Sequence, residues 1–412
     1  MTDTELRIRI VQSLAEVPAA AWNTCANQLM KCSLKEKHED NSSRQLSTQG
    51  QTGNPFVSHE FLSSLEESAC VGGRTGWQPR HLLAEDATGG LRGAAPCYVK
   101  THSRGEYVFD HGWAEAFERA GGDYYPKLQI AVPFTPVTGP RLLAAPGPLA
   151  DVVRGALGDA IKELTTTSKL SSSHVTFLTE AEWRALGQRG FLQRTDQQFH
   201  WENGGYANFD DFLNCLASRK RKAIRRERKE ALQAGVDVCW LTGSQLTEAV
   251  WDAFFAFYME TGSRKWGRPY LTRDFFSIIG QKMRDRILLV MARRAGRWIA
   301  GAINFIGADT LYGRNWGATE HHPFLHFELC YYQAIDYAIA NGLKRVEAGA
   351  QGEHKLARGY LPQTTYSAHF IANPALRRAV ADFLSRERAY VQAAAEELAA
   401  AAPFRKDLVE QE

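Results

Sequence analysis

The sequence predicts an α/β protein made of two similar halves, each a mixed, mostly antiparallel sheet flanked by helices. Two observations support this fold class. Both halves show the same order of elements: helices, a ladder of strands, a central helix and a further strand. In addition, residues 310–360 read as strand, polar loop, helix, strand and polar loop, which is the layout of an α/β binding site. We therefore expect a ligand-binding cleft in the second half.

The composition is that of an ordinary soluble globular protein, with 44% hydrophobic and 23% charged residues. The length of 412 residues suggests more than one domain, and we place the boundary between residues 1–207 and 208–412. The net charge of +3 is small, so an anionic partner would have to meet local basic patches. No apolar run is long enough to span a membrane, and no secretory signal opens the chain. We therefore expect a cytoplasmic protein.

Cysteine usage agrees with a reducing compartment. The seven cysteines lie at positions 25, 32, 70, 97, 215, 239 and 330, and no pair has CxxC spacing. A scattered, odd-numbered set favours free thiols over a disulfide framework or a zinc site. A catalytic cysteine stays open as an alternative, without a supporting pattern.

The first half is expected to be a run of strands and helices of its own. Strands are predicted at residues 5–13, 81–85, 91–101, 174–178 and 199–203, and at the start of 124–143. Helices are predicted at residues 14–25, 58–68, 114–119, 146–166 and 180–187. The stretch 27–54 is polar and poor in aromatic residues, so we expect an exposed, mobile insertion there.

The second half begins with a long basic helix and ends with a long helix rich in alanine. Helices are predicted at residues 210–232, 244–265, 272–284, 327–341 and 374–402. Strands are predicted at residues 236–241, 287–293, 298–306, 310–316, 344–348 and 367–371. Tight turns join the three strands between 287 and 316, which predicts an antiparallel ladder.

Four stretches of the second half carry a resemblance to a known family. They are SRKRKAIRRERKEALQAGVDV, FYMETGSRKWGRPYLTRDFF, TLYGRNWGATEHHPFLHFELCYYQAIDYAIANGLKRVEAGAQG and GEHKLARGYLPQ. In this order they are similar to the basic hinge helix, the ET-x-x-R helix, the strand–helix–strand unit and the FK segment of the Fem peptidoglycan-bridge aminoacyl transferases. The whole chain outside residues 27–54 resembles still more a FemAB-like branch of predicted N-acyltransferases. The phrases GEYVFDHGWA, YYPKLQIAVPFTPVTGPRLL and EAGAQGEHKLARGY recur in that branch.

The resemblance implies two GNAT-like domains in tandem and the transfer of an acyl or aminoacyl group to an amine. The implied donor is acyl-CoA or an aminoacyl-tRNA, used as a co-substrate, with no tightly bound cofactor. The implied acceptor is the amine of a peptidoglycan precursor or of a peptide-like metabolite. Two features depart from the pattern. The R/Q-x-x-G-x-G/A loop of GNAT enzymes is absent before Phe327, and His354 and Tyr360 stand where the family has phenylalanines.

Lys355 is the first catalytic candidate, because it matches the lysine of the family's FK segment. A cation at this position would stabilise the oxyanion that forms during acyl transfer. His354 and Glu347 are candidates for relaying the proton of the attacking amine. The alternatives are a solvated loop lysine and a structural ion pair of Glu347 with Arg314 or Lys344.

Substrate contacts are expected around the end of the strand at 310–316. The resemblance places such contacts at Tyr312 and Arg264. We add Arg314, Asn315 and Gln351, since guanidinium groups suit phosphate or carboxylate and polar side chains line the same loops. Salt bridges between elements are the alternative for the arginines.

His322 and His326 belong to a histidine-rich loop, GATEHHPFLH, that also includes His321 and precedes Glu328. At helical spacing they would share one face, as in a metal pair. No third ligand follows at a familiar spacing, so we predict no metal and a loop that contacts substrate. Histidines that cap the following helix are the remaining alternative.

The basic helix around residues 219–229 carries a dense run of cations. We predict that Arg221, Arg225 and Arg226 contact phosphate groups, of tRNA or of a nucleotide-linked substrate. A solvated helix paired with acidic neighbours is the alternative. For the whole chain, the alternative to an N-acyltransferase is a non-catalytic small-molecule or nucleic-acid binding module that keeps the fold.

Overall fold

The computed structural model of the chain describes residues 5–26, 53–266, 269–349 and 352–405. Nearly all of the polar stretch 27–54, for which we predicted a mobile insertion, lies outside these residues. None of the described helices combines the length and the apolar composition that a membrane span requires.

Within the described residues, eleven strands form one long sheet in the order β10-β11-β12-β13-β14-β9-β15-β8-β6-β5-β2. They are β2 Trp77–Pro79, β5 Cys97–Lys100, β6 Lys127–Ile130, β8 Ser172–Leu178, β9 Leu192–Glu202, β10 Val236–Leu241, β11 Ile287–Arg294, β12 Arg297–Ile306, β13 Thr310–Ala318, β14 Arg345–Glu347 and β15 Leu361–Ile371. A smaller sheet has the order β1-β3-β4-β7. Its strands are β1 Arg7–Val11, β3 His81–Glu85, β4 Leu91–Ala95 and β7 Leu143–Ala144.

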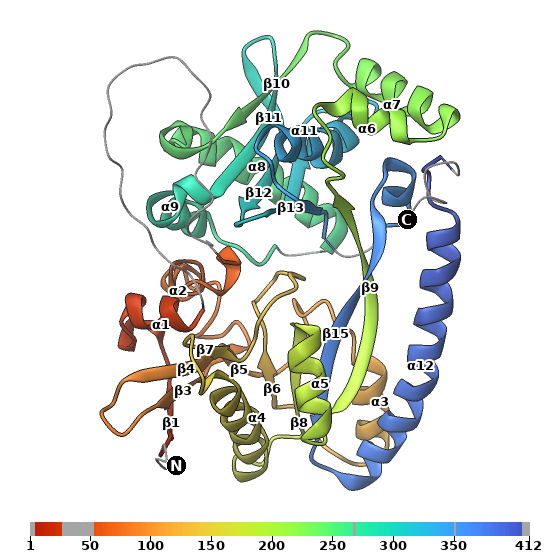
Figure 1. The fold of residues 1–412 in the computed structure, drawn as a ribbon. Coiled ribbons are helices and arrows are strands. Elements are labelled where there is room, and N and C mark those ends of the chain that lie inside the picture. The colour runs from red at the N-terminus through yellow and green to blue at the C-terminus, as the bar shows by residue number, and fades with distance from the viewer. Residues whose placement is uncertain (1–4, 27–52, 267–268, 350–351, 406–412) are drawn as a thin grey trace.

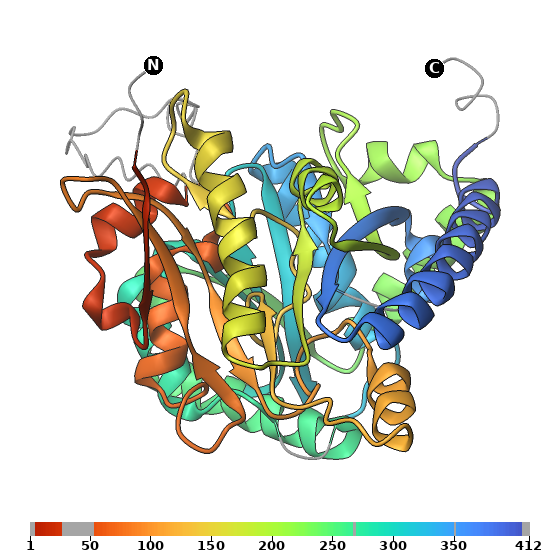
Figure 2. The ribbon, with the colours of Figure 1, turned by 90° about the horizontal axis from the view of Figure 1, so that it is seen from below.

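Helices flank both sheets (Figures 1 and 2). They are α1 Ala19–Cys25, α2 His59–Glu67, α3 His111–Arg119, α4 Ala150–Thr167, α5 Glu180–Gln188, α6 Phe209–Cys215, α7 Ser218–Ala231, α8 Glu248–Trp266, α9 Arg273–Lys282, α10 Leu325–Phe327, α11 Gln333–Ala340 and α12 Pro374–Ala400. A π-helical turn, Glu328–Tyr332, joins α10 to α11. Short 3₁₀ turns are Leu14–Glu16, Pro55–Val57, Gly243–Gln245, Arg284–Arg286 and Glu353–Arg358.

Each half contains the same unit, an antiparallel ladder followed by a helical crossover to a parallel strand. In the first half β2, β5 and β6 are antiparallel, and α4 leads to β8, which is parallel to β6. In the second half β10 to β13 are antiparallel, and the helix from α10 to α11 leads to β14, which is parallel to β13. The predicted fold class, a mixed and mostly antiparallel α/β architecture of tandem GNAT-like units, is confirmed.

The two units exchange strands at the centre of the long sheet. β9 pairs with β15 over residues 192–200 and then with β14 over residues 200–202. β15, which comes from the second half, also pairs with β8 of the first half. In Figure 1 these two long strands run between the upper and lower parts of the molecule, with α12 alongside. The sheet is therefore continuous through both halves.

Several predicted elements have different boundaries in the structure. The run 91–101 is two strands in different sheets, because Pro96 has no N–H to donate and interrupts the ladder. The predicted helix 210–232 is two helices, α6 and α7, separated by Leu216 and Ala217. The strands predicted at 199–203 and 367–371 are the ends of the longer β9 and β15.

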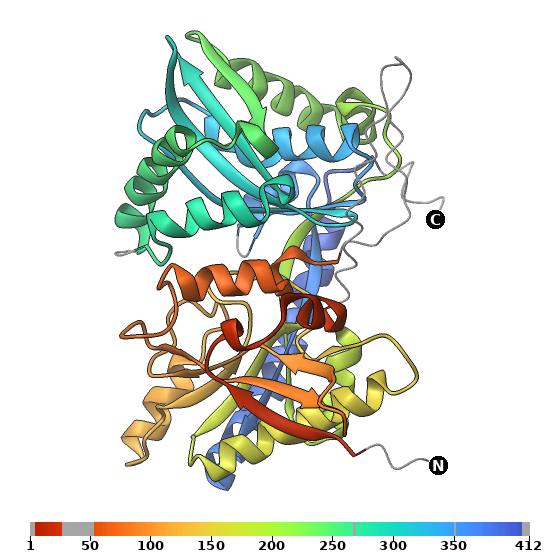
Figure 3. The ribbon, with the colours of Figure 1, turned by 90° about the vertical axis from the view of Figure 1, so that its left-hand side faces the viewer.

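An aromatic core joins the two halves at their boundary. Phe56 and Phe61 of the first half pack against Phe305 of β12, with ring centroids 4.8 and 5.6 Å apart. Phe56 also meets Tyr312 of β13 edge-on at 5.4 Å. α2 lies against α9 at the same boundary, which Figure 3 shows from the side. Such aromatic contacts bury large areas and favour one relative placement of the halves.

The gap between the parallel strands of the first half is closed by a buried arginine. Beyond the end of β6, Gly139 donates its N–H to Phe177 O, which brings residues 139–141 beside β8. The fully buried guanidinium of Arg141 donates to the carbonyls of Val137, Gly139, Pro140 and Thr176. Burial lowers the pKa of Arg141 to about 10, so the group is a cation at neutral pH.

We expect Arg141→Ala to lower the free energy of unfolding by about 3–5 kcal/mol, because buried carbonyls lose a charged donor. Denaturant unfolding followed by tryptophan fluorescence measures the change. Arg154→Ala is the matched control, since Arg154 is one-third exposed and pairs with Asp151 three residues away on the same helix. Its effect should stay below about 0.5 kcal/mol. Equal losses of unfolding free energy in the two variants would show that the buried guanidinium of Arg141 does not stabilise the fold.

Candidate functional site

The corresponding gap of the second half lies between β13 and β14, where their pairing stops. The pairing of β13 with β14 ends at Tyr312 and Glu347. β14 stops there, whereas β13 continues to Ala318 and carries Arg314, Asn315 and Trp316 past the end of its neighbour. The outer side of β13 is covered tightly by α8, because a Cβ at Gly317 would lie 2.0 Å from Phe257 O. The part of β13 that continues past β14 therefore borders the gap beyond Glu347 with Arg314, Asn315 and Trp316.

Glu347 is a buried carboxylate that both halves contact. Thr138, from the first half, donates its hydroxyl to Glu347 Oε1 at 3.0 Å. Arg314 Nη2 lies 3.8 Å from Glu347 Oε2, an ion pair too long for a hydrogen bond. Burial raises the pKa of Glu347, while Arg314 and the hydroxyl of Thr138 oppose that rise. A carboxylate with a raised pKa is a better proton acceptor than an exposed one.

Arg314 is held between aromatic rings at the boundary of the halves. Its guanidinium carbon lies 4.7 Å from the ring centroid of Phe56 and 5.5 Å from that of Tyr312. Its side chain is only 5% exposed, and its Nη1 donates to Gly313 O at 2.7 Å. Burial lowers the pKa of Arg314, with Glu347 opposing the shift.

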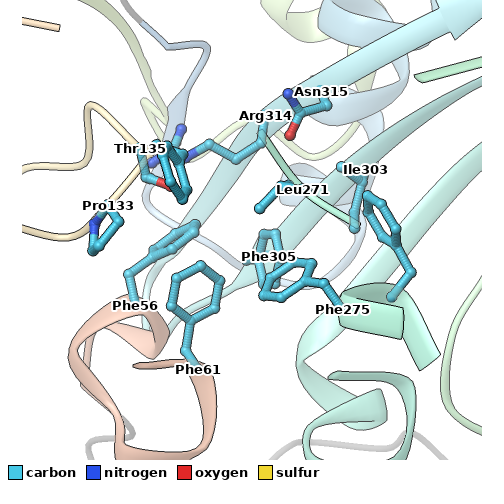
Figure 4. A pocket seen from close by; sticks show the side chains of 12 residues that line it. Phe56, Phe61, Pro133, Thr135, Leu271, Phe275, Ile303, Phe305, Arg314 and Asn315 are labelled. Carbon is cyan, nitrogen blue, oxygen red and sulfur yellow. The ribbon is translucent and has the colours of Figure 1, made fainter. Parts of the chain in front are cut away.

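A small cavity, which we call the inter-half cavity, lies against Arg314 and Asn315 (Figure 4). Its remaining wall is formed by Phe56, Phe61, Pro133, Phe134, Thr135, Leu271, Phe275, Phe276, Ile303 and Phe305. The space of about 10 Å³ admits about one water-sized group. Figure 4 shows the guanidinium end of Arg314 beside Thr135, with the ring of Phe56 next to it and the ring of Phe61 beyond Phe56.

Lys355 lies inside the protein and not in bulk solvent. The residue is 2% exposed, and its Nζ donates to Gly349 O at 2.9 Å. Burial lowers the pKa of Lys355 to about 8, and the charge of Arg314 adds to the shift. Gly349 and Gly352 have φ angles of 76° and 112°, which side chains other than glycine adopt only with strain. The two glycines thus let the chain turn back and carry Lys355 into the gap.

His354 stands on the exposed side of the same turn. Its Nε2 lies 3.0 Å from the hydroxyl of Tyr331, which belongs to the π-helical turn. Its ring is 5.7 Å from that of Phe327 and 6.4 Å from that of His326. Because Lys355 is the next residue, His354 and Lys355 point to different sides of the same short segment. π-helical turns inside α-helices are frequent at functional sites.

Arg358 fixes the turn that carries His354 and Lys355. Its Nη1 donates to His354 O at 2.7 Å, and its Nη2 donates to Glu227 Oε2 at 2.8 Å. Its guanidinium lies 3.5 Å from the ring centroid of Phe327. The segment therefore depends on contacts with α7 and with the helix after β13.

A larger open hollow, which we call the histidine hollow, adjoins this turn through Phe327 and His326. It is lined by Glu260, Thr261, Trp316, Ala318, Thr319, Glu320, His321, His322, Phe324, His326 and Phe327. Its volume of about 490 Å³ is in the range of small-molecule sites. The rings of Trp316 and His326 lie 4.9 Å apart and form part of its wall.

The histidine loop shows no metal-binding arrangement in the part of the chain that the structure describes. His322 Nε2 lies 3.0 Å from Glu320 Oε2, and Glu320 also accepts from Arg294. Glu328 is fully buried and forms a bidentate pair with Arg228 of α7. That carboxylate is engaged by the guanidinium of α7.

The basic helix α7 has an inner and an outer face. Glu227 and Arg228 point inward, where Arg228 reaches Glu328 and Asp336. Arg225 and Arg226 are exposed, and Arg225 pairs with Asp210 at 2.8 Å. Arg221 is half-buried, and its Nη1 lies 3.5 Å from Asn214 Oδ1. The three predicted phosphate-binding arginines are thus at the surface, outside the gap.

The structure brings six of the predicted residues together and leaves two undescribed. Those that surround the gap or adjoin it are Glu347, Lys355, His354, Arg314, Asn315 and Tyr312. His322 and His326 line the histidine hollow. The side chain of Arg264 and the whole of Gln351 lie outside the described residues.

Sequence reasoning missed the contribution of the first half. Phe56, Thr135 and Thr138 reach the site from residues more than 170 positions before β13. Tyr331 was also missed, although its place four residues after Phe327 on a predicted helix was a usable signal. No local pattern marks the other three.

The chain is similar to one family of proteins and to several solved structures. A family model, FemAB-like, described as peptidoglycan biosynthesis/recognition, matches residues 13–406. No curated protein matches the chain. Three similar solved structures have low identity: FemX, L-PGS from Bacillus licheniformis, and a tandem GNAT protein from the clavulanic acid biosynthesis pathway. Their identities are 12%, 8% and 11%, and their TM-scores are 0.48, 0.49 and 0.46.

The matches extend over most of both partners. They cover 78%, 81% and 90% of this chain, and 93%, 93% and 99% of the other chains, in the same order. The family model spans both halves, including β9, β15 and the segment that carries Lys355. The chain therefore belongs to the FemAB-like family.

Proposed function

We propose that the protein is an N-acyltransferase that moves an acyl or aminoacyl group from an activated donor to an amine in the gap beyond Glu347. The observation that carries this proposal is the convergence of a buried lysine, a buried carboxylate and a buried arginine where β13 continues past β14. The matching gap of the first half is filled by Arg141, so only the second half offers such a site among the described residues. Membership in a family described by peptidoglycan biosynthesis supports a transferase.

The residues of the gap have the properties that acyl transfer to an amine requires. The amine nitrogen attacks the carbonyl carbon of the donor, and its proton passes to Glu347 directly or through a water. The carbonyl oxygen gains negative charge, which the ammonium of Lys355 stabilises in a site shielded from water. The tetrahedral intermediate then breaks its bond to the donor's sulfur or oxygen, which leaves with a proton. His354, paired with Tyr331 on the exposed side, supplies or accepts that proton.

The donor is acyl-CoA or an aminoacyl-tRNA in this proposal, and the acceptor is the amine of a peptidoglycan precursor or of a peptide-like metabolite. In this proposal the exposed cations of α7, including Arg225 and Arg226, contact donor phosphates outside the gap. The histidine hollow, with its aromatic wall at Trp316 and Phe327, has the size of a substrate moiety. Tyr312 and Asn315 border the gap, and in this proposal they contact the acceptor.

A binding module without catalysis is the second candidate function. It is favoured by one observation: the gap lacks the phosphate-cradling R/Q-x-x-G-x-G/A loop that GNAT enzymes have before the central helix. Such a protein would bind a donor or acceptor without turning it over. The first candidate explains the buried Lys355 and Glu347 better, because a binding role alone does not need their perturbed pKa values.

The decisive experiment offers the purified full chain a panel of labelled acyl-CoA and aminoacyl-tRNA donors with peptidoglycan-precursor and free-amine acceptors. Mass spectrometry detects the acylated amine. We expect Lys355→Ala to lower kcat/KM about a hundredfold or more, because the oxyanion loses its cation. Lys344→Ala is the matched control, since Lys344 is exposed nearby in the same half, and it should retain activity within about twofold.

Full transfer activity in Lys355→Ala would remove this lysine from the mechanism. Retention of donor binding without any acylated product, across the whole panel, would favour the binding module instead. Circular dichroism of each variant separates a catalytic loss from a loss of fold.

The pH dependence of transfer gives an independent prediction. Because the pKa of Lys355 is about 8, its cation is lost as pH rises through that value, and kcat/KM should fall with an apparent pKa near 8. Lys355→Arg keeps its charge above pH 12 and should move this alkaline limb upward by at least about one unit. An unmoved limb in the arginine variant would assign the titration to another group.

Loss of folded protein at alkaline pH is not expected to cause this fall in kcat/KM. The lysine pKa is depressed by burial from 10.5, so between about pH 8 and 10.5 the unfolded chain binds more protons than the folded one. This difference therefore raises stability as pH rises through that window. Unfolding measured at the same pH values should show no loss of stability from Lys355.

A further inference from the structure

We propose that Arg314 is the receptor for a carboxylate of the substrate, and that an apolar group lies next to this carboxylate. The inference rests on the proposed function, because it names the chemical class of one substrate of the same site. The unit recognised is a planar carboxylate held against an aromatic wall, at the point where the two halves meet.

The free hydrogen-bonding capacity of Arg314 has a defined shape. Among the described residues, Nε and Nη2 of Arg314 have no hydrogen-bond partner, although the side chain is only 5% exposed. Nη1 alone is satisfied, by Gly313 O. Nε and Nη2 form one edge of the planar guanidinium, so their N–H bonds run side by side. That edge matches the two oxygens of one carboxylate.

The carboxylate of Glu347 does not accept hydrogen bonds from this edge of the guanidinium. Glu347 Oε2 is 3.8 Å from Nη2, and this oxygen also lacks a hydrogen-bond partner in the described part of the chain. The other carboxylate oxygen, Oε1, accepts a hydrogen bond at 3.0 Å from the hydroxyl of Thr138, which belongs to the first half. Buried N–H groups without hydrogen-bond partners are unfavourable, and a ligand that completes the unpaired edge of this guanidinium removes that cost.

The surroundings favour an added negative charge. The charge of Arg314 lowers the pKa of Lys355, so two buried cations repel each other here. Glu347, the ion-pair partner of Arg314, has a pKa that burial raises, and Arg141 is balanced mainly by Glu182. One further anionic group beside Arg314 reduces the repulsion between Arg314 and Lys355.

The inter-half cavity selects the chemistry next to that charge. Apart from Arg314, Asn315 and Thr135, its wall is apolar and largely aromatic. Figure 4 shows the ring of Phe56 next to the guanidinium end, with the rings of Phe61, Phe275 and Phe305 farther from it. The space of about 10 Å³ takes about one oxygen atom, which suits one oxygen of a flat carboxylate better than a tetrahedral phosphate. The rings of Phe56 and Tyr312 hold the guanidinium plane in place for it.

The test compares two ligands of nearly equal shape on the unmodified full chain. Isothermal calorimetry measures binding of phenylacetate, of its neutral analogue phenylacetamide and of inorganic phosphate. We expect phenylacetate to bind about tenfold or more tighter than phenylacetamide, because only the acid presents two anionic oxygens. Equal binding of acid and amide, no binding of the acid, or tighter binding of phosphate would each overturn the proposal.

Variants then assign the preference to one side chain. Arg314→Gln should abolish the preference for the acid and leave the amide unchanged, while Arg314→Lys should keep part of it, since charge remains but the paired edge is lost. Arg297→Gln, at an exposed hairpin residue, controls for the loss of one positive charge. An unchanged acid preference in Arg314→Gln would overturn the assignment. If Arg314→Gln does not fold, Arg314→Lys and the acid–amide comparison on the unmodified chain still decide.

The outcome is separable from that of the proposed function. Transfer activity with no acid preference would remove only the carboxylate receptor. An acid preference that depends on Arg314, without any transfer across the donor panel, would keep the receptor and remove the transferase.

Discussion

The exchange of β9 and β15 is the constraint on which the rest of the structure depends. Each of these strands begins beside one half and ends beside the other, so backbone hydrogen bonds cross the boundary of the halves along most of their length. Rotating one half against the other would break this ladder, and each buried backbone group that lost its partner would be unfavourable. The exchange therefore holds Thr138 and Phe56 at fixed positions beside Glu347 and Arg314, and a site assembled from both halves becomes possible.

The same supersecondary unit gives different results in the two halves because the chain takes a different path after each ladder. After β6 the chain folds back and places Arg141 between the parallel strands, where its guanidinium caps four carbonyls. After β13 the chain leaves along the histidine loop, and a later turn brings Lys355 into the gap, where its Nζ donates to Gly349 O. One copy of the unit thus serves stability, and the other gathers ionisable side chains at its strand ends. Polar residues at the ends of strands are available for chemistry only in the second case.

The sequence predicts the parts of this site that depend on local order, and it does not predict those that depend on pairing across the halves. Lys355 and Glu347 belong to a short strand and a glycine-rich turn that can be read within fifteen residues. Thr138 and Phe56 have no such signal, because their approach to β13 is decided by the strand exchange. Glu328 looked like a member of the histidine group, but a buried carboxylate needs a partner, and Arg228 of α7 supplies it.

The segment that bears Lys355 owes its position to side chains rather than to regular secondary structure. It is a 3₁₀ turn between two glycines, so its own backbone hydrogen bonds do not fix its direction. Arg358 supplies the missing constraint by holding His354 O, Glu227 and the ring of Phe327 at once. Because Glu227 lies on α7, the turn is tied to the helix whose outer face carries the exposed cations. The inner face of α7 therefore has a structural role, whereas Arg225 and Arg226 of its outer face are exposed.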